Sequence, residues 1–324
     1  MIRDQLERCC QESPPTQCEE LIETIAEVRG VPVRNVAVSS GSSSLMFSLL
    51  PQLLDERSRV LLLSPMYGEY SHILQHVIGC HITYFVLEDA NGFAIDADDL
   101  ISQAREHDAV ILVNPNSPTG VYCESMADIV SSIARSNNPG SQCKMIWVDE
   151  TYINYLPDAV SLEPLCGSLP ELVVCKSMSK CYALSGLRVA YAVSQNMATL
   201  RRFIPPWAVS LPGQLAAVAA LRNDAYYAQQ YEVIHSERRK MQQALDDLGF
   251  QVFSGVANYL LTYLPAASGY SSTRFIEACR EQGLFVRDAQ NMGVLLPNNA
   301  VRFAVRSPEE NEKMLSIVDA ILAL

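Results

Sequence analysis

Residues 172–188 read Leu172-Val-Val-Cys-Lys-Ser-Met-Ser-Lys180-Cys-Tyr-Ala-Leu-Ser-Gly-Leu-Arg188, and this stretch guides the interpretation of the whole chain. Its first four residues form a short apolar run typical of a buried strand. Lys180 follows among small hydroxylated residues, and a lysine amine held away from water can attack a carbonyl to form a Schiff base. Ser177, Ser179 and Arg188 can bind a phosphate through hydroxyl groups and a charge-assisted fork. Taken alone, a solvated loop with incidental charges explains the stretch at least as well.

Other apolar runs of the same kind predict further strands at Val60–Leu63, Ala109–Val113, Met145–Val148 and Arg188–Val193. Helical patterns lie between the runs, over Ser43–Leu54, Tyr70–Ile78, Ala97–Arg105 and Met126–Arg135. This alternation predicts an α/β fold, with a mostly parallel sheet between layers of helices.

The order of elements changes in the last third of the chain. We expect a long helical stretch over about Leu215–Leu248, and then strands and helices at Gln251–Phe253, Tyr259–Leu264, Ser272–Gln282, Leu284–Arg287, Ala300–Val305 and Pro308–Leu322. This α+β pattern predicts a second, smaller domain. We therefore divide the chain into an N-terminal segment (1–30), a large domain (31–225) and a small C-terminal domain (226–324).

The composition restricts the class of protein. The chain has 324 residues, 49% of them hydrophobic and 19% charged, as in an ordinary globular protein. The formal net charge of -12 argues against nucleic acid as a partner, because phosphate backbones need a surplus of Lys and Arg. The ten cysteines show neither CxxC pairs nor metal-ligand spacing. With no signal peptide and no membrane-spanning run, we expect free thiols, no metal and a cytoplasmic location.

Polar residues follow two more of the predicted strands and open one predicted helix. Asp149 and Tyr152 come directly after one strand, and Asn114-Pro-Asn-Ser117-Pro-Thr-Gly120 follows another. Gly41, Ser42 and Ser43 open a helix, where free N–H groups can meet an anion. Ligands of open α/β sheets bind at the carboxyl ends of the strands, so we expect these residues near one another. Each also has an ordinary structural explanation as a helix cap, a turn or an interface aromatic.

Together the four segments carry a family resemblance. Ser-Met-Ser-Lys180 with Leu184-Ser-Gly-Leu-Arg188 resembles the cofactor-lysine signature of class I/II aminotransferases, which use pyridoxal 5'-phosphate (PLP). Val148-Asp-Glu-Thr-Tyr152 and Asn114–Gly120 look like that family's ring-nitrogen and ring-hydroxyl segments. The resemblance implies the PLP-transferase fold of type I, with Lys180 carrying PLP as a Schiff base. Asp149 would pair with the ring nitrogen, so that PLP acts as an electron sink.

Within the superfamily the chain looks closest to histidinol-phosphate aminotransferases and threonine-phosphate decarboxylases. Ser64-Pro-Met-Tyr67-Gly-Glu-Tyr70 matches the segment whose first aromatic stacks on the cofactor, which gives Tyr67 that role. Arg302 would bind the substrate α-carboxylate, and Arg287 would lie near the phosphate-bearing end of the substrate. The run from Arg302 to Asn311 resembles the decarboxylases more than the aminotransferases. For Arg306, a surface salt bridge is an equally good explanation.

Three departures from the family pattern affect the expectations. Ser117 stands where the family usually has an asparagine that touches the ring hydroxyl, which leaves Tyr152 to make that contact alone or through a water. Ser13 stands where a tyrosine usually reaches the PLP phosphate of the neighbouring subunit. About a dozen residues precede the resemblance, so we expect a shortened N-terminal segment. Three explanations stay open: a more open site that admits a bulkier substrate, a site covered by another chain, or a domain that is one part of a fused system.

The predicted function is a PLP-dependent aminotransferase that exchanges amino groups between a small, anionic amino acid and a 2-oxo acid, in a homodimer. Lys180, freed from the cofactor, would move the proton at the substrate α-carbon as general base and acid. Decarboxylation of a phosphorylated or phosphonate-bearing amino acid is the close alternative. In that case the substrate carboxylate is aligned with the π-system of the cofactor ring, and the substrate loses CO2 and becomes an amine. A catalytically silent homologue is the third reading, but both Lys180 and Asp149 are present.

Overall fold

The computed structural model describes residues 5–135 and 143–323, and its central feature is a seven-stranded sheet. The strand order is β1-β7-β6-β5-β4-β2-β3, in which β7 runs antiparallel to both neighbours and the other neighbours are parallel. The strands are β1 (Val36–Ser39), β2 (Arg59–Ser64), β3 (His81–Val86), β4 (Ala109–Val113), β5 (Met145–Asp149), β6 (Leu172–Ser177) and β7 (Ala190–Val193). The predicted α/β fold with a mostly parallel sheet is confirmed.

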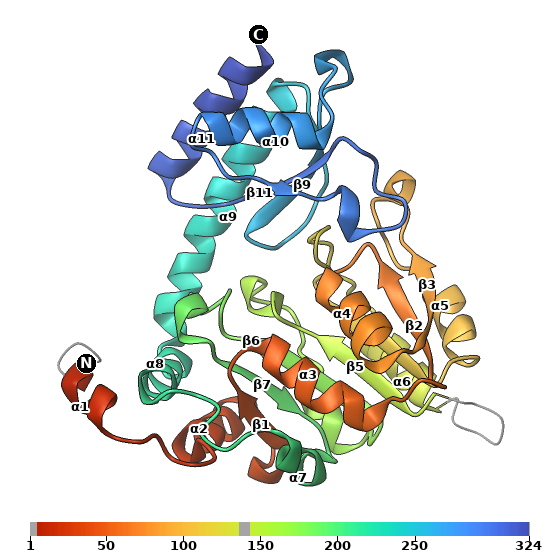
Figure 1. The fold of residues 1–324 in the computed structure, drawn as a ribbon, viewed down its shortest axis with the longest axis vertical. Coiled ribbons are helices and arrows are strands. Elements are labelled where there is room, and N and C mark those ends of the chain that lie inside the picture. The colour runs from red at the N-terminus through yellow and green to blue at the C-terminus, as the bar shows by residue number, and fades with distance from the viewer. Residues whose placement is uncertain (1–4, 136–142, 324) are drawn as a thin grey trace.

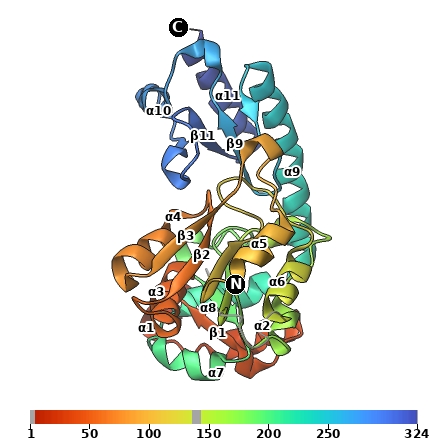
Figure 2. The same cartoon turned by 90° about the vertical axis from the view of Figure 1, so that its right-hand side faces the viewer.

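Helices cover both faces of this sheet. Figure 2 shows α3 and α4 on one side and α5 and α6 on the other. The helices of this part are α1 (Leu6–Gln11), α2 (Glu19–Arg29), α3 (Ser42–Leu53), α4 (Gly68–His72), α5 (Ala97–Ala104), α6 (Met126–Arg135), α7 (Met197–Leu200) and α8 (Leu211–Leu221). Because helices bury both faces, the central strands β4, β5 and β6 are apolar along nearly their whole length.

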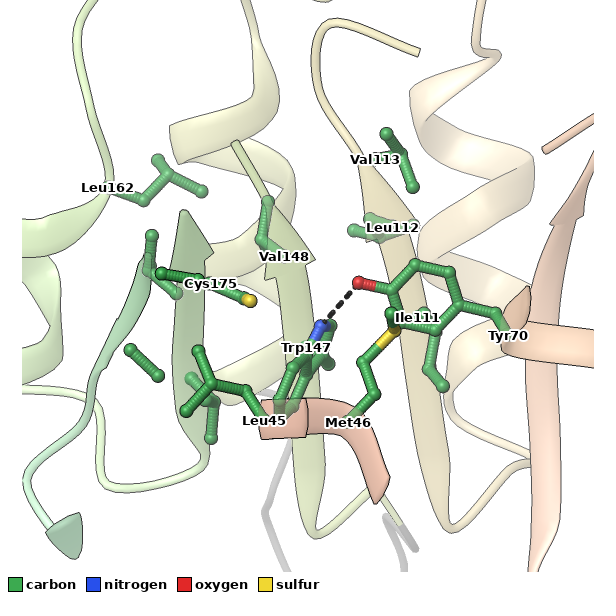
Figure 3. Packing of buried hydrophobic residues seen from close by; sticks show 14 of the residues in the cluster. Leu45, Met46, Tyr70, Ile111, Leu112, Val113, Trp147, Val148, Leu162 and Cys175 are labelled. Atoms are coloured by element: carbon green, nitrogen blue, oxygen red, sulfur yellow. Dashed lines mark hydrogen bonds between the residues drawn. The ribbon is translucent and has the colours of Figure 1, made fainter. Parts of the chain in front are cut away.

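The sheet core is closely packed around β5. Trp147 of β5 is fully buried and contacts side chains from α3 and α4, among them Leu45, Met46 and Tyr70 (Figure 3). Large aromatic side chains contribute strongly to such a core because each buries a large area. Tyr70 is also 0% exposed, so the loop and helix that follow β2 are held tightly against β5.

A smaller antiparallel sheet, ordered β10-β11-β9-β8, lies beyond the carboxyl ends of the large sheet (Figure 1). Helix α9 runs from the large sheet to the small one. A separate cluster that includes Phe250, Leu260, Phe275 and Phe303 forms its core. The elements are α9 (Asp224–Asp247), β8 (Gln251–Val252), β9 (Tyr259–Tyr263), α10 (Ser272–Glu281), β10 (Arg287–Asp288), β11 (Ala300–Ala304) and α11 (Pro308–Leu322). The domain boundaries at 30/31 and 225/226 stay predictions, and residues 1–4 and 324 lie outside the described ranges.

Three predicted elements differ from the structure. The single helical stretch over 215–248 is wrong, because Arg222 and Asn223 separate α8 from α9 and the Asn223 side chain donates to Ala219 O at the end of α8. The strand predicted at Leu284–Arg287 begins only at Arg287, since Leu284 N still bonds to Cys279 O in the turn that ends α10. Strand β7 begins at Ala190, because Arg188 has left-handed backbone angles (φ 53°).

Two strands and one helical irregularity were absent from the sequence prediction. β1 has only four residues, and β3 is an edge strand whose exposed and half-buried residues interrupt the apolar run. The helix predicted over Tyr70–Ile78 is α4 followed by a π-helical segment, Ile73–Ile78. Both strands take part in the main sheet, at its opposite edges.

One loop of the small sheet is fixed directly to the large one. Met66 N donates to Met292 O, and Val294 N donates to the Ser64 hydroxyl. Gly293 lies so close that an added Cβ would be 2.5 Å from Pro65 Cβ. This 292–294 loop therefore connects the two sheets beside the carboxyl end of β2.

The helices of the described part of the chain are all too short or too polar to cross a membrane. The predicted cytoplasmic location stays a prediction.

Candidate active site

A cavity of about 340 Å³ lies where the carboxyl ends of β4, β5 and β6 meet the small sheet. Every residue that the sequence predicted for the site lines this cavity, with the exception of Gly41. The lining residues are Ser42, Ser43, Tyr67, Val113, Ser117, Asp149, Thr151, Tyr152, Ser177, Ser179, Lys180, Ser185, Arg188, Arg287, Met292 and Arg302. The rule that ligands bind at the carboxyl ends of parallel strands thus selected residues that share one cavity.

The two lysines of the 172–188 stretch have opposite surroundings. Lys176 is buried, with its Nζ 2.7 Å from Glu163 Oε2 and 3.2 Å from Glu150 Oε2. Burial alone would lower the pKa of Lys176, but these carboxylates outweigh it and hold that pKa above its ordinary value. Lys176 is therefore a permanently charged member of a buried ion-pair network.

Lys180 instead reaches into the cavity, where no described residue forms a hydrogen bond or ion pair with its amine. Its pKa is lowered, mainly because neighbouring protein atoms exclude water and also because of the positive charges of Arg302 and Arg188. The side chain remains partly open to solvent in spite of this partial burial. A larger fraction of Lys180 is thus neutral at a given pH, and the neutral amine is the form that attacks a carbonyl.

Asp149, at the end of β5, is a buried carboxylate that faces the cavity. Its Oδ2 accepts from Tyr70 Oη at 2.8 Å and its Oδ1 accepts from Thr151 N at 2.9 Å. Burial raises the pKa of Asp149, and the bonds from Thr151 and Tyr70 work against that rise. No Lys or Arg of the described ranges forms an ion pair with Asp149, so its charge can accept a cationic group of a ligand.

Hydroxyl groups and a guanidinium gather at one end of the cavity. Ser42 and Ser43 open the twelve-residue helix α3, and Ser177 and Ser179 follow β6. Arg188 Nη1 donates to Ser179 Oγ (3.3 Å) and to Ser185 O (3.2 Å). A helix N-terminus, hydroxyl donors and a guanidinium together make a favourable anion site.

Gly41 shapes this anion site without lining the cavity. Its φ of 94° lies in a region that L side chains rarely adopt, and an added Cβ would be 2.6 Å from Arg188 Nη2. The guanidinium therefore occupies the space that any larger residue would fill. The sequence prediction grouped Gly41 with the cofactor-binding residues, and the structure places it behind Arg188.

Arg302, on β11, is held against the cavity wall by two neighbours. Its Nη1 donates to Ser117 Oγ at 3.3 Å, and its Cζ lies 4.6 Å from the centre of the Tyr259 ring. A guanidinium over an aromatic face gains a cation–π attraction. Tyr259 in turn donates from its hydroxyl to Asn116 O at 2.8 Å. Ser117, which stands where the family usually has an asparagine at the ring hydroxyl, thus supports Arg302 in this structure.

Arg287 and Arg302 are direct cross-strand partners on β10 and β11. Like charges directly opposite each other on adjacent strands are destabilising. Both side chains line the cavity, which has four cationic side chains and the single carboxylate of Asp149. In a chain with a net charge of -12, such a cationic cavity is suited to an anionic ligand.

Two tyrosines complete the cavity wall. Tyr67, which precedes α4, is 39% exposed, and burial of its phenol raises its pKa to about 12. Tyr152 is buried beneath Tyr259 in an edge-to-face contact, with ring centres 5.2 Å apart. Burial raises the pKa of Tyr152 to about 12 although the charge of Arg302 lowers it. Both phenols are therefore neutral hydrogen-bonding groups near neutral pH.

Two other residues of the sequence analysis lie away from the cavity. Arg306 is exposed and its Nε and Nη2 are both 2.8 Å from Glu310 Oε1, which is the surface salt bridge considered as the alternative. Ser13 is exposed and does not line the cavity. Its predicted position near a neighbouring subunit stays a prediction.

Tyr70, Thr151, Tyr259 and Met292 had no role predicted from the sequence. Tyr70 ends the quoted segment Ser64–Tyr70 and Tyr259 begins the predicted strand Tyr259–Leu264, but their partners Asp149 and Arg302 are far away in the chain. Thr151 could have been found as the residue whose N–H reaches back to an aspartate two positions earlier, a common turn pattern. Met292 carries no sequence signal of a site.

Comparisons with known proteins agree with these features. Residues 3–318 match the family model described as aminotransferase class I and II. A histidinol-phosphate aminotransferase of Archaeoglobus fulgidus is 30% identical over 311 residues, which are 95% of this chain and 84% of that protein. A threonine-phosphate decarboxylase of Salmonella typhimurium is 27% identical over 322 residues, covering 97% and 84% of the two chains. Among solved structures, a histidinol-phosphate aminotransferase from Clostridium acetobutylicum superimposes with a TM-score of 0.85 at 22% identity, covering 99% and 95%.

Proposed function

The chain belongs to the aminotransferase class I and II family, whose members use PLP, and on this premise we propose that it transfers the α-amino group of a small anionic amino acid to a 2-oxo acid. One combination of residues carries the proposal. The Lys180 amine, whose pKa is lowered, lines the same cavity as the buried Asp149 carboxylate, which has no ion-pair partner among the described residues. The family supplies the general reaction, whereas the anionic substrate is our proposal.

The residues of the cavity fit PLP. The phosphate would bind to the hydroxyl groups of Ser42, Ser43, Ser177 and Ser179 and to the guanidinium of Arg188. Gly41 leaves room for that guanidinium, because a Cβ at position 41 would displace it. Asp149, which lacks a counter-ion among the described residues, would bind the protonated ring nitrogen. Tyr67 would pack on the ring, and Tyr152 would donate to its hydroxyl oxygen. When bound, PLP supplies an aldehyde carbon that takes up amino groups and a cationic ring that withdraws electrons from the substrate α-carbon.

Lys180 has two roles in the proposal. Its amine holds the cofactor before the substrate arrives, and afterwards it takes and returns the proton at the substrate α-carbon. Both roles need a neutral amine, and the lowered pKa of Lys180 increases the fraction in that form. Lys176 cannot take either role, because its ammonium group stays protonated in ion pairs with Glu150 and Glu163.

Two arginines would orient the substrate. Arg302, whose position is fixed by Ser117 and Tyr259, would bind the α-carboxylate with its guanidinium fork. Arg287 lies opposite Arg302 on the neighbouring strand and would bind a second anionic group at the distal end of the substrate. A dianionic ligand would also relieve the repulsion between these two like charges. Phosphate- and phosphonate-bearing amino acids have the required pair of anionic groups.

Decarboxylation is the second candidate, favoured by the similarity to a threonine-phosphate decarboxylase over 97% of this chain. A single-turnover experiment separates the candidates. PLP-loaded protein is mixed with phosphothreonine in the absence of a 2-oxo acid; histidinol phosphate, which has no α-carboxylate and can only be transaminated, is tested separately as an amino donor. Conversion of the cofactor to its amine form supports the aminotransferase, whereas retained PLP with released CO2 supports the decarboxylase. A protein that does neither with any amino acid contradicts the proposed function.

The substrate class has its own test. Replacing Arg287 with alanine should weaken binding of phosphothreonine by about tenfold or more, because a charge-assisted bond is lost, and should leave binding of phenylalanine nearly unchanged. Equal losses for the two amino acids would refute the anionic substrate without affecting the aminotransferase reaction. A homodimer is part of the same proposal, and sedimentation of the active enzyme as a monomer would contradict it.

A further inference from the structure

Tyr70 lies behind the cavity and joins two other buried side chains. It belongs to α4, is 0% exposed and does not line the cavity. Its Oη lies 2.9 Å from Trp147 Nε1, a bond that Figure 3 shows, and 2.8 Å from Asp149 Oδ2. Trp147 and Asp149 are both on β5, two positions apart, so their side chains are on the same side of that strand.

The direction of each hydrogen bond in this chain is determined by its members. An indole N–H can only donate, so the Tyr70 oxygen must accept from Trp147. Tyr70 has one hydroxyl proton, and an ionised carboxylate can only accept, so that proton points to Asp149. With Trp147 on one side, the Tyr70 hydroxyl is held as a donor toward the carboxylate.

We propose that Tyr70 is a positioning residue that fixes the Asp149 carboxylate and keeps it ionised, with Trp147 setting the direction of the Tyr70 hydroxyl. This inference rests on the proposed role of Asp149 as the partner of the PLP ring nitrogen. A carboxylate that took up a proton would no longer favour a protonated ring, and the ring would withdraw electrons less strongly.

The need for such a donor follows from the burial of Asp149. Its carboxylate has lost most of its hydration, which favours the neutral acid. Three donors oppose this effect: the Thr151 hydroxyl, Thr151 N at Oδ1 and Tyr70 Oη at Oδ2. The backbone donor belongs to the adjoining turn, and no side-chain substitution removes it directly. The Thr151 hydroxyl belongs to the same turn, two residues after Asp149, whereas the Tyr70 hydroxyl is the donor that reaches the carboxylate from a different element and that a mutation can remove.

Other titratable groups face Asp149 from the surrounding elements. They are Tyr67 before α4, Tyr70 of α4, Tyr152 after β5, Cys175 of β6 and Lys180 in the cavity. Burial raises the pKa of both Tyr67 and Tyr152 to about 12 and raises those of Tyr70 and Cys175 well above their ordinary values. These four groups stay neutral in the acidic to neutral range, which leaves Asp149 itself and Lys180, whose pKa is lowered, to be distinguished by a label on the aspartate carboxyl carbon.

The test compares Tyr70→Phe with Trp147→Phe. Tyr70→Phe removes both hydrogen bonds of this buried chain, whereas Trp147→Phe removes only the bond to Tyr70 and leaves the donor to Asp149 in place. The apo protein is labelled with ¹³C at aspartate side-chain carboxyls and titrated by NMR, and the Asp149 signal is assigned with Asp149→Asn. The dissociation constant of PLP is then measured against pH for each protein.

For Tyr70→Phe we expect the Asp149 midpoint to rise by about 1–2 pH units, because a hydrogen bond to a charged group is lost. PLP affinity should fall over the same pH interval. For Trp147→Phe we expect a much smaller shift, although both variants lose thermal stability. Equal midpoints for Tyr70→Phe and the unmodified protein, or equal shifts in the two variants, would overturn the inference.

Two further measurements keep the test decisive. If Tyr70→Phe does not fold, 3-fluorotyrosine is placed at position 70, where its more acidic hydroxyl should lower the Asp149 midpoint; an unchanged midpoint overturns the inference. If Asp149→Asn binds PLP as tightly as the unmodified protein, the proposed role of Asp149 fails. The NMR titration of the apo protein tests Tyr70 independently of that result.

Discussion

Replacement of Gly41 by alanine tests the anion site through a residue that does not itself line the cavity. The new Cβ would lie 2.6 Å from Arg188 Nη2 and 3.1 Å from Cζ, so the guanidinium must move. Loss of one charge-assisted hydrogen bond costs about 1.5–3 kcal/mol. The affinity for PLP should therefore fall by about 10- to 150-fold. The backbone at φ 94° and ψ 163° adds strain of about 1–3 kcal/mol, which lowers the stability of the apo protein.

The assay is a titration of the apo protein with PLP, followed by absorbance and by equilibrium dialysis. Gly30→Ala is the matched control, because Gly30 also has a left-handed backbone (φ 64°) but an added Cβ would have nothing within 4 Å. The control should lose about 1–2 kcal/mol of stability and keep its PLP affinity. If Gly41→Ala binds PLP as tightly as the control, Arg188 does not hold the phosphate and the reasoning is wrong.

The buried and the cavity-facing lysine should respond differently to substitution. Lys180→Ala should abolish the covalent attachment of PLP, measured by mass spectrometry after borohydride reduction, and attachment that persists would contradict the assignment. Lys176→Met should retain the attachment. Its free energy of unfolding in urea should fall by about 3–5 kcal/mol, because two buried carboxylates are left unpaired. Glu163→Gln should cost more stability at pH 7 than at pH 4. Burial raises the pKa of Glu163, but Lys176 and Arg29 outweigh it and hold that pKa below the ordinary 4.5, so the stability it contributes is present above pH 4.5 and is lost as the pH falls through the folded-state value. A cost that is the same at both pH values in urea unfolding would refute this account.

The sequence predicted the large sheet well because parallel strands buried on both faces are continuous apolar runs. β4 was predicted with its exact residues, and β5 and β6 were predicted up to their polar ends. The short β1 and the edge strand β3 lacked that signal. The gap between α8 and α9 depended on Asn223, whose side chain competes with the helix backbone.

The site was predictable to the extent that strand ends determine it. Asp149 and Lys180 follow adjacent strands, β5 and β6, and therefore meet at one edge of the sheet. What could not be predicted depends on contacts between distant segments. Tyr70 reaches Asp149 from 79 positions away, and Ser117 reaches Arg302 from 185 positions away. The buried ion pairs of Lys176 were likewise not predicted, because Glu150 and Glu163 reach it from other segments of the chain.

The 292–294 loop has a consequence for how this enzyme can change through evolution. Met292 lines the cavity, and its carbonyl also binds Met66 N of the large sheet, next to the close contact between Gly293 and Pro65. A substitution that reshapes the cavity at this point also alters the contacts that join the two sheets. New substrate preferences should therefore arise more readily at Arg287, which is exposed and takes no part in those contacts, than at positions 292–294.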